Sequence, residues 1–135
     1  MKVEGKEAEF LQNHSLHFLE MAFKTDKRQR LADPDGHGLR KGVCGDTIEI
    51  FVNVKDGHIE EACFDCDGCI NTVACANTIA HMIDGKPVEE AWKVTPEAVI
   101  EYLETLPGKE NHCAELAVGA LYLALSEAGK TKPGA

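Results

Sequence analysis

The sequence predicts an α+β fold, in which a small three-stranded antiparallel sheet has helices packed on one of its faces. The first observation is the alternation of apolar and polar residues over 47–54, which is typical of a half-buried strand. The second is Asp56-Gly57, a strong hairpin signal, which joins that strand to another over 58–66. The third is a change to helical spacing from Ile70 onward. Together these observations place the sheet in the middle of the chain.

The chain before this hairpin is predicted to hold one helix and the first strand. Apolar residues recur at helical spacing over 7–24 between charged flanks, which predicts one amphipathic helix that needs a partner surface. We interpret the basic run from Lys24 to Arg30 as a solvated helix end and loop, with a docking patch as the alternative. A turn-rich loop starts at Asp33, and residues 38–43 are expected to form the first strand.

The chain after the hairpin is predicted to be helical, with local signals at the boundaries. Gly85 ends one helix, and Thr95 is an N-cap followed by Pro96 at the first helical position. The expected helices cover residues 70–84, 88–92, 95–103 and 113–126. The two ends, 1–6 and 129–135, are expected to fray.

Length and composition restrict the function. The 135 residues are expected to form a single domain with its own hydrophobic core. A net charge of −9 disfavours nucleic acid and anionic membranes as partners and favours partners with basic faces. No apolar run approaches a transmembrane span, and the polar stretch from Met1 to Glu7 carries no secretory signal. We therefore expect a cytoplasmic protein, whose 6 cysteines act as thiols, metal ligands or catalytic groups rather than as disulfides.

Four cysteines lie close together between Cys63 and Cys75, and their spacing admits a ferredoxin-like alternative. Cys63, Cys66 and Cys69 resemble the opening of a bacterial ferredoxin motif, but Cys75 comes too late and no proline follows it. On a regular strand Cys63 and Cys66 point to opposite faces. We interpret Cys63 as an outward thiol, and Cys66 and Cys75 as buried structural residues.

Three cysteines share another kind of location, because each lies at the end of a predicted element. Cys44 just precedes a strand, and Cys69 and Cys113 lie near helix starts, where the helix dipole favours thiolate. The polar residues near them are Asp46, Asp67 and His112. Three thiolates with one His or Asp are a workable ligand set for tetrahedral zinc or for an iron–sulfur cluster. Spacing alone does not establish that the three cysteines meet.

Three motifs, taken in order, point to a family. They are Cys44-Gly45-Asp46 ahead of the alternating strand, Gly68-Cys69 at a strand-to-helix junction, and Leu106-Pro107 followed by His112-Cys113-Ala114-Glu115-Leu116-Ala117. With these motifs the chain resembles the iron–sulfur cluster scaffold family of IscU and the N-terminal domain of NifU. Their order and separation fit the family from about Asp33 to Leu125, which is most of the chain.

The resemblance implies a scaffold and carrier rather than an enzyme, on which a labile [2Fe–2S] cluster is assembled. The ligands would be Cys44, Cys69 and Cys113, with Asp46 or His112 as the fourth. Sulfur would arrive as persulfide from a cysteine desulfurase, with Cys113 as the favoured acceptor, and iron would come from an iron donor. The finished cluster would pass to apo iron–sulfur proteins. A fourth ligand harder than thiolate should bind more loosely and ease this release.

The chain departs from the family pattern close to its last cysteine. The family often has a lysine three residues before that cysteine, where this chain has Glu110, with Lys109 one place away. The segment that the family's dedicated chaperone recognises is present only in the altered form Leu106-Pro107-Gly108-Lys109-Glu110, which weakens the case for chaperone binding. His112 favours the IscU and NifU side of the family over the zinc-dependent SufU branch.

Two alternative functions stay open. One is a zinc-binding sulfur acceptor that uses the same Cys, Asp and His residues. The other is a ferredoxin-like electron carrier built on the four clustered cysteines. Cys63, Cys66 and Cys75 are extra to the shared pattern, and sulfur relay or alternative ligation would be their functional roles if they are not structural.

Overall fold

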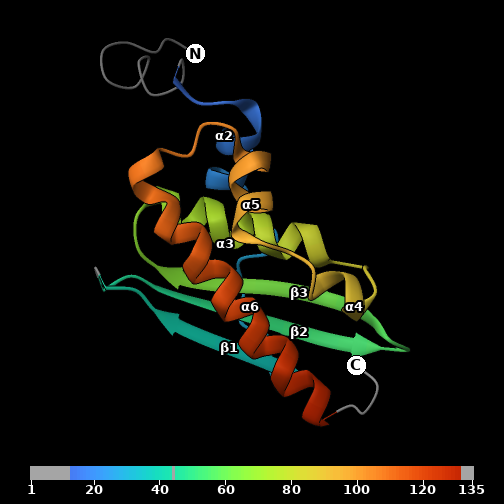
Figure 1. Ribbon diagram of the computed structural model, residues 1–135. Coiled ribbons are helices and arrows are strands. Elements are labelled where there is room, and N and C mark those ends of the chain that lie inside the picture. The colour runs from blue at the N-terminus through green and yellow to red at the C-terminus, as the bar shows by residue number, and fades with distance from the viewer. Residues whose placement is uncertain (1–12, 44, 132–135) are drawn as a thin grey trace.

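The computed structural model, which describes residues 13–43 and 45–131, contains a three-stranded antiparallel sheet with helices packed against it (Figure 1). The strands are β1 (Gly36–Lys41), β2 (Thr47–Lys55) and β3 (His58–Asp67), in the order β1-β2-β3. Fully buried Ile50 pairs with fully buried Phe64, as the alternating pattern requires. The predicted sheet is therefore confirmed.

β1 lies directly against α6 (Asn111–Thr131) because two of its residues are glycines. The strand begins at Gly36, slightly earlier than predicted. A Cβ atom at Gly36 would collide with the carbonyl of Ala124, and one at Gly38 would collide with the carbonyl of Ala120. The absence of side chains thus lets the helix backbone come close to the strand.

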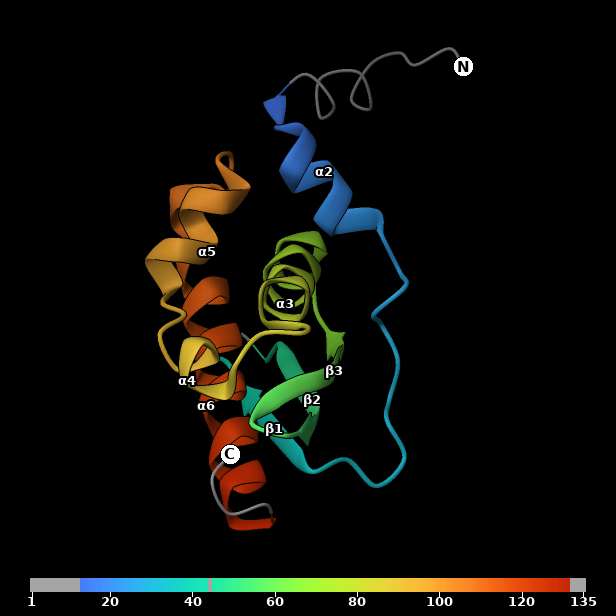
Figure 2. The same ribbon diagram turned by 90° about the vertical axis from the view of Figure 1, so that its right-hand side faces the viewer.

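The helices within the described residues lie on one side of the sheet, as predicted (Figure 2). Besides α6 they are α2 (Leu16–Phe23), α3 (Ile70–Ile83), α4 (Val88–Ala91), α5 (Pro96–Leu103) and the 3₁₀ helix η1 (Gly108–Glu110). The predicted cap of α5 is present, since Ala98 N donates to Thr95 Oγ1 at 3.2 Å. Among these described helices, none has the length and apolar character needed to cross a membrane.

The helix predicted over 7–24 does not run unbroken, because Ser15 is the N-cap of α2. The amide of Phe18 donates to Ser15 Oγ at 3.1 Å, and this hydroxyl donates to the carbonyl of Leu103 at 2.8 Å. The tie to the end of α5 fixes where α2 starts, and local periodicity cannot reveal a partner so far along the chain. Residues 7–12 lie outside the described part of the chain.

The last helix is longer than predicted. α6 continues past residue 126 to Thr131, so the stretch from Gly129 that we expected to fray begins as helix. Ala124 and Ala128 are fully buried, and a Cβ atom at Gly36 would touch Ala128 Cβ. Packing of small residues along β1 therefore extends the helix. The terminal residues 1–6 and 132–135 are not among those described.

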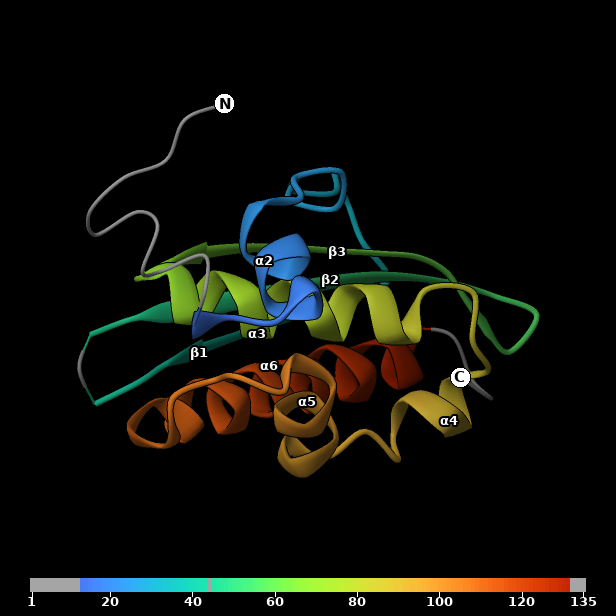
Figure 3. The same cartoon turned by 90° about the horizontal axis from the view of Figure 1, so that it is seen from above.

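The segment 24–35 crosses the opposite face of the sheet (Figures 2 and 3). Most of the basic run from Lys24 to Arg30 is exposed, as the prediction of a solvated helix end and loop requires. Phe64 N donates to the carbonyl of Lys27 at 3.0 Å, and Gln29 Nε2 donates to Cys63 Sγ at 3.3 Å. Cys63 is consequently only 1% exposed, so its description as an outward thiol was wrong. The predicted face is right, but a segment distant in sequence covers it, and burial raises the pKa of this thiol.

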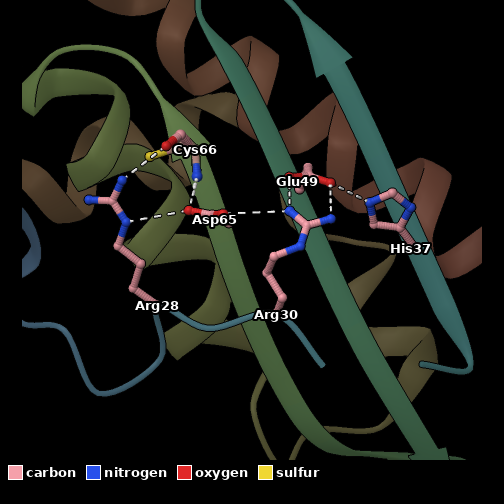
Figure 4. Close-up of polar contacts among 6 residues, drawn as sticks. All are labelled: Arg28, Arg30, His37, Glu49, Asp65 and Cys66. Atoms are coloured by element: carbon pink, nitrogen blue, oxygen red, sulfur yellow. Dashed lines mark hydrogen bonds and ion pairs between the residues drawn. The ribbon is translucent and has the colours of Figure 1, made fainter. Parts of the chain in front are cut away.

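Ion pairs hold this covering segment on the sheet (Figure 4). Arg28 Nε lies 3.5 Å from Asp65 Oδ1, and Arg30 Nη2 donates to Glu49 Oε1 at 3.0 Å. His37 Nε2 lies 2.9 Å from the same Glu49 oxygen. The hydrogen bonds from Arg30 are the largest influence on the pKa of Glu49 and lower it. Desolvation comes next and raises the pKa, but the hydrogen bond from His37 adds to the effect of Arg30, so the pKa is lowered overall.

Candidate metal centre

Three chain junctions meet at one end of the molecule (Figures 1 and 3). They are the β1–β2 connection with Asp46, the β3–α3 junction with Cys69, and the η1–α6 junction with His112 and Cys113. The remaining predicted ligand, Cys44, lies outside the described residues. The structure therefore places four of the five predicted site residues at the same end.

The side chain of Thr72 links three of these residues. Its hydroxyl, which is fully buried on the first turn of α3, donates to Asp46 Oδ2 at 2.7 Å. The same oxygen lies 3.7 Å from Cys69 Sγ and 3.7 Å from Cys113 Sγ. Asp46, Cys69 and Cys113 are thus gathered around one hydroxyl group. Sequence reasoning missed Thr72, whose only local signal is its position three residues after Cys69 on the expected helix.

Gly68 makes this arrangement possible. A Cβ atom at Gly68 would lie 2.8 Å from Thr72 Oγ1 and 2.9 Å from Asp46 Oδ2. A carbon atom does not normally come this close to a non-bonded oxygen atom. The Gly68-Cys69 motif thus combines two physical requirements. The glycine leaves room for the Asp46 carboxylate, and the following residue is the N-cap of α3.

Cys69 is the accessible thiol of the centre. It is exposed and has β-region backbone angles at the N-cap of α3. Desolvation is the largest single influence on its pKa and raises it, but hydrogen bonds from the backbone and side chains of Thr72 and Asn71 together outweigh this and lower the pKa. The thiolate is therefore easier to form here than in an ordinary cysteine, as the position at a helix start predicts.

Cys113 has the opposite electrostatic environment. It is only 1% exposed, and burial raises the pKa of its thiol to about 12, with the negative charges of Cys69 and Glu110 adding to the effect. The expected thiolate at the start of α6 is thus not favoured by its protein surroundings. A bound cation would reverse this preference, because a coordinating thiol is deprotonated by its metal.

His112 and Glu110 flank Cys113. His112 Nε2 lies 3.6 Å from Cys113 Sγ and 3.6 Å from Glu110 Oε2, while Cys113 Sγ lies 3.7 Å from Glu110 Oε2. The His112 Nδ1 atom contacts the carbonyl of Lys109 at 3.2 Å. Sequence reasoning treated Glu110 only as a departure from the family pattern, although its spacing of three residues from Cys113 places both on one helical face.

The other cysteines do not join this group. Cys66 faces the helices within the hydrophobic core, and burial raises the pKa of its thiol to about 11. Cys75 is fully buried within α3, which raises its pKa well above the ordinary value. Cys63 lies on the other face of the sheet beneath Gln29. The four thiols of the ferredoxin-like alternative therefore cannot converge on one cluster, because Cys63 and Cys66 lie on opposite faces of the sheet. That alternative is wrong.

Comparison with known proteins identifies the family. A sequence model described as "NifU-like N terminal domain" matches residues 29–132, which is most of the chain. The chain belongs to this NifU-like family. The recognised resemblance is therefore confirmed at the level of the family.

Curated relatives of this NifU-like chain carry the name iron–sulfur cluster assembly scaffold protein IscU. One from Archaeoglobus fulgidus is 40% identical over 97 residues, covering 71% of this chain and 63% of that protein. Another, from Buchnera aphidicola of Acyrthosiphon pisum, is 33% identical over 91 residues, covering 67% of this chain and 71% of that protein. The NifU-like chain thus spans just under two thirds of the Archaeoglobus protein's length.

Solved structures share the fold of this NifU-like chain. A nitrogen-fixing NifU-like protein (N-terminal) from Brucella abortus has a TM-score of 0.71 at 17% identity, covering 87% of this chain and 95% of that chain. A candidate SUF-system scaffold protein from Fervidobacterium islandicum has a TM-score of 0.71 at 17% identity, covering 84% and 97%. At such identities the likeness demonstrates the fold alone.

Proposed function

We propose that the protein is a scaffold on which a labile [2Fe–2S] cluster is assembled and from which it is handed to apo-proteins. The ligands in this proposal are Cys44, Cys69 and Cys113, with Asp46 or His112 as the fourth. The observation that carries the proposal is the buried Thr72 hydroxyl, which touches Asp46, Cys69 and Cys113 from three distant parts of the chain. The names of the relatives support the same role.

The donor set suits a cargo that must be released. Thiolates bind iron strongly, whereas a carboxylate or imidazole is a harder ligand that holds an iron–sulfur centre less firmly. The Asp46 carboxylate is already oriented by Thr72, so its geometry does not have to be created when iron arrives. We infer a carrier without catalytic turnover, formed by residues 1–135 as one domain and working in the cytoplasm, where thiols stay reduced.

Sulfur delivery is proposed to occur by persulfide transfer from a cysteine desulfurase. An acceptor thiolate attacks the terminal persulfide sulfur, the new S–S bond forms on the acceptor, and the desulfurase cysteine leaves as thiolate. The sulfur must then be reduced to sulfide by an external electron donor. Cys113 is the proposed acceptor, and because its thiol is buried and burial raises its pKa to about 12, docking of the desulfurase must uncover it.

Anaerobic reconstitution with ferrous iron and inorganic sulfide tests the scaffold function. The parent chain should gain visible absorption that disappears when an apo-ferredoxin is added. Cys69→Ala and Cys113→Ala should gain no such absorption. Cys63→Ala is the matched control, since this cysteine lies on the far face of the sheet and its loss should leave the cluster intact.

Zinc is the alternative occupant of the same donors, because Cys, His and carboxylate are the usual ligands of tetrahedral zinc. Metal analysis of the purified chain, followed by reconstitution after zinc removal, separates the two functions. A chain that keeps zinc and takes up no cluster would contradict the scaffold proposal.

A further inference from the structure

Glu110, His112 and Cys113 form a compact group of three different donors at the start of α6. Their donor atoms all lie within 4.8 Å of one another. The three separations are 3.6 Å between Glu110 Oε2 and His112 Nε2, 3.6 Å between His112 Nε2 and Cys113 Sγ, and 3.7 Å between Cys113 Sγ and Glu110 Oε2. The three atoms therefore form a nearly equilateral triangle.

This triangle matches one face of a metal tetrahedron. Ligand atoms at about 2.0–2.3 Å from a tetrahedral ion lie roughly 3.3–3.8 Å from one another. A hydrogen bond between imidazole and carboxylate would instead be about 2.7–3.2 Å long. The Glu110–His112 separation is too long for a good hydrogen bond and has the length that coordination to a shared ion requires.

The surrounding backbone orients two of the donors. The contact of His112 Nδ1 with the Lys109 carbonyl at 3.2 Å suits a proton on Nδ1, which leaves the lone pair of Nε2 on the side of Glu110 and Cys113. Glu110 is held in η1, where its amide donates to the carbonyl of Pro107 at 2.8 Å. The carboxylate side chain is 22% exposed and the imidazole 40%, so an ion from solution can reach them.

We propose that Glu110, His112 and Cys113 form an entry site for a single divalent metal ion, which is Fe²⁺ if the proposed scaffold function holds. Cys113 belongs to both ligand sets, since its sulfur also contacts Thr72 beside Asp46 and Cys69. An ion held at the entry site is thus already bonded to one of the cluster ligands. Assembly then requires exchange of Glu110 for ligands on the other side of Cys113, and no electrons are transferred in this exchange.

Titration of the full-length apo-protein with Co²⁺ under anaerobic conditions tests the entry site, because Co²⁺ reports tetrahedral geometry and thiolate ligation by its absorption. The parent should bind Co²⁺ with a thiolate charge-transfer band. Glu110→Gln should weaken Co²⁺ binding about tenfold or more, since even the loss of an outer-shell partner of a ligand costs about that much. Glu101→Gln, which removes the same charge from an exposed position on α5, should bind as the parent does.

Two further variants distinguish the entry site from the cluster ligands. Cys69→Ala should keep Co²⁺ binding within about threefold, since its thiol is not one of the three donors, whereas Cys113→Ala should lose the charge-transfer band. Unchanged Co²⁺ affinity in Glu110→Gln, with a circular dichroism spectrum like that of the parent, would overturn the proposal. So would equal loss of binding in Cys69→Ala and Cys113→Ala, which would place the ion among the cluster thiols.

Cluster reconstitution keeps this test separate from the scaffold function. If Glu110→Gln binds Co²⁺ normally and the parent still assembles a cluster, the entry-site proposal is wrong and the scaffold proposal is supported. If the parent assembles no cluster but Glu110→Gln weakens Co²⁺ binding as expected, the entry-site proposal is supported and the scaffold proposal is wrong.

Discussion

The hydroxyl of Thr72 donates a 2.7 Å hydrogen bond to the carboxylate of Asp46, a residue 26 positions earlier in the chain. The same oxygen lies 3.7 Å from the sulfur atoms of Cys69 and Cys113. Thr72 thus holds the β1–β2 connection against the starts of α3 and α6. We regard it as a positioning residue for the proposed cluster.

Replacing Thr72 by valine keeps the shape of the side chain and removes its donor. We expect Thr72→Val to lose roughly 1–2 kcal/mol of unfolding free energy, because the Asp46 carboxylate loses a buried partner. The reconstituted cluster should also decay faster. Denaturant unfolding and the decay of visible absorption measure the two effects. Thr72→Ser, which retains the hydroxyl, is the control, and a Thr72→Val cluster as long-lived as that of the parent would argue against positioning.

Adding a methyl group at Gly68 should disturb the same contact from the other side. The new Cβ atom would lie 2.8 Å from Thr72 Oγ1 and 2.9 Å from Asp46 Oδ2. We expect Gly68→Ala to be destabilised by roughly 1–3 kcal/mol, which is the usual range for overpacking. Gly108→Ala is the matched control, because a Cβ atom there meets nothing within 4 Å. Equal unfolding midpoints for the two variants would show that the site tolerates the methyl group.

The described cysteines should differ widely in their rates of alkylation. Cys69 is exposed and its pKa lies below the ordinary value of 9.0, so it carries more thiolate than a free cysteine at about pH 8. Cys113, with a pKa of about 12, and the buried Cys75 should react far more slowly. Iodoacetamide labelling followed by peptide mass spectrometry measures each rate, with the guanidinium-unfolded chain as the reference. Modification of Cys113 as fast as that of Cys69 would be inconsistent with the burial and the raised pKa of the Cys113 thiol.

Glu49 should make stability depend on pH on the acid side. Its hydrogen bonds with Arg30 and His37 lower its pKa below the ordinary value of 4.5. The contribution to stability is therefore complete above about pH 4.5 and is lost as the pH falls through the pKa of the folded state. Glu49→Gln should be less stable than the parent near neutral pH, and the difference should narrow below about pH 4.5. Chemical unfolding at several pH values measures this, with the exposed Glu60→Gln as control; a constant difference would exclude the linkage.

The elements that could be predicted are those whose signals are local. Alternation over 47–54, the Asp56-Gly57 turn and the Thr95 cap each act within a few residues, so the sheet and most helix boundaries followed from the sequence. The interruption at Ser15 did not, because the hydroxyl is fixed by Leu103. The burial of Cys63 depends likewise on Gln29, which belongs to a distant segment.

The candidate centre was predictable only in part for the same reason. Residue types and motif order pointed to Asp46, Cys69, His112 and Cys113, but spacing did not establish that they meet. Thr72 was missed because a threonine on a helix has no signal until its distant partners are known. The neutral form of the Cys113 thiol also comes from packing, because burial raises its pKa. Its position near a helix start would by itself favour the thiolate.

Each of the two edge strands has a backbone amide that already donates a hydrogen bond to a group outside the sheet. On β3 the amide of Phe64 donates to Lys27 O at 3.0 Å, and on β1 the amide of His37 donates to Glu127 Oε1 at 3.1 Å. An incoming strand from another polypeptide would have to displace these contacts before it could extend the sheet. Recognition of this molecule by strand addition is therefore disfavoured. Polymerisation of neighbouring copies through their sheet edges is disfavoured for the same reason.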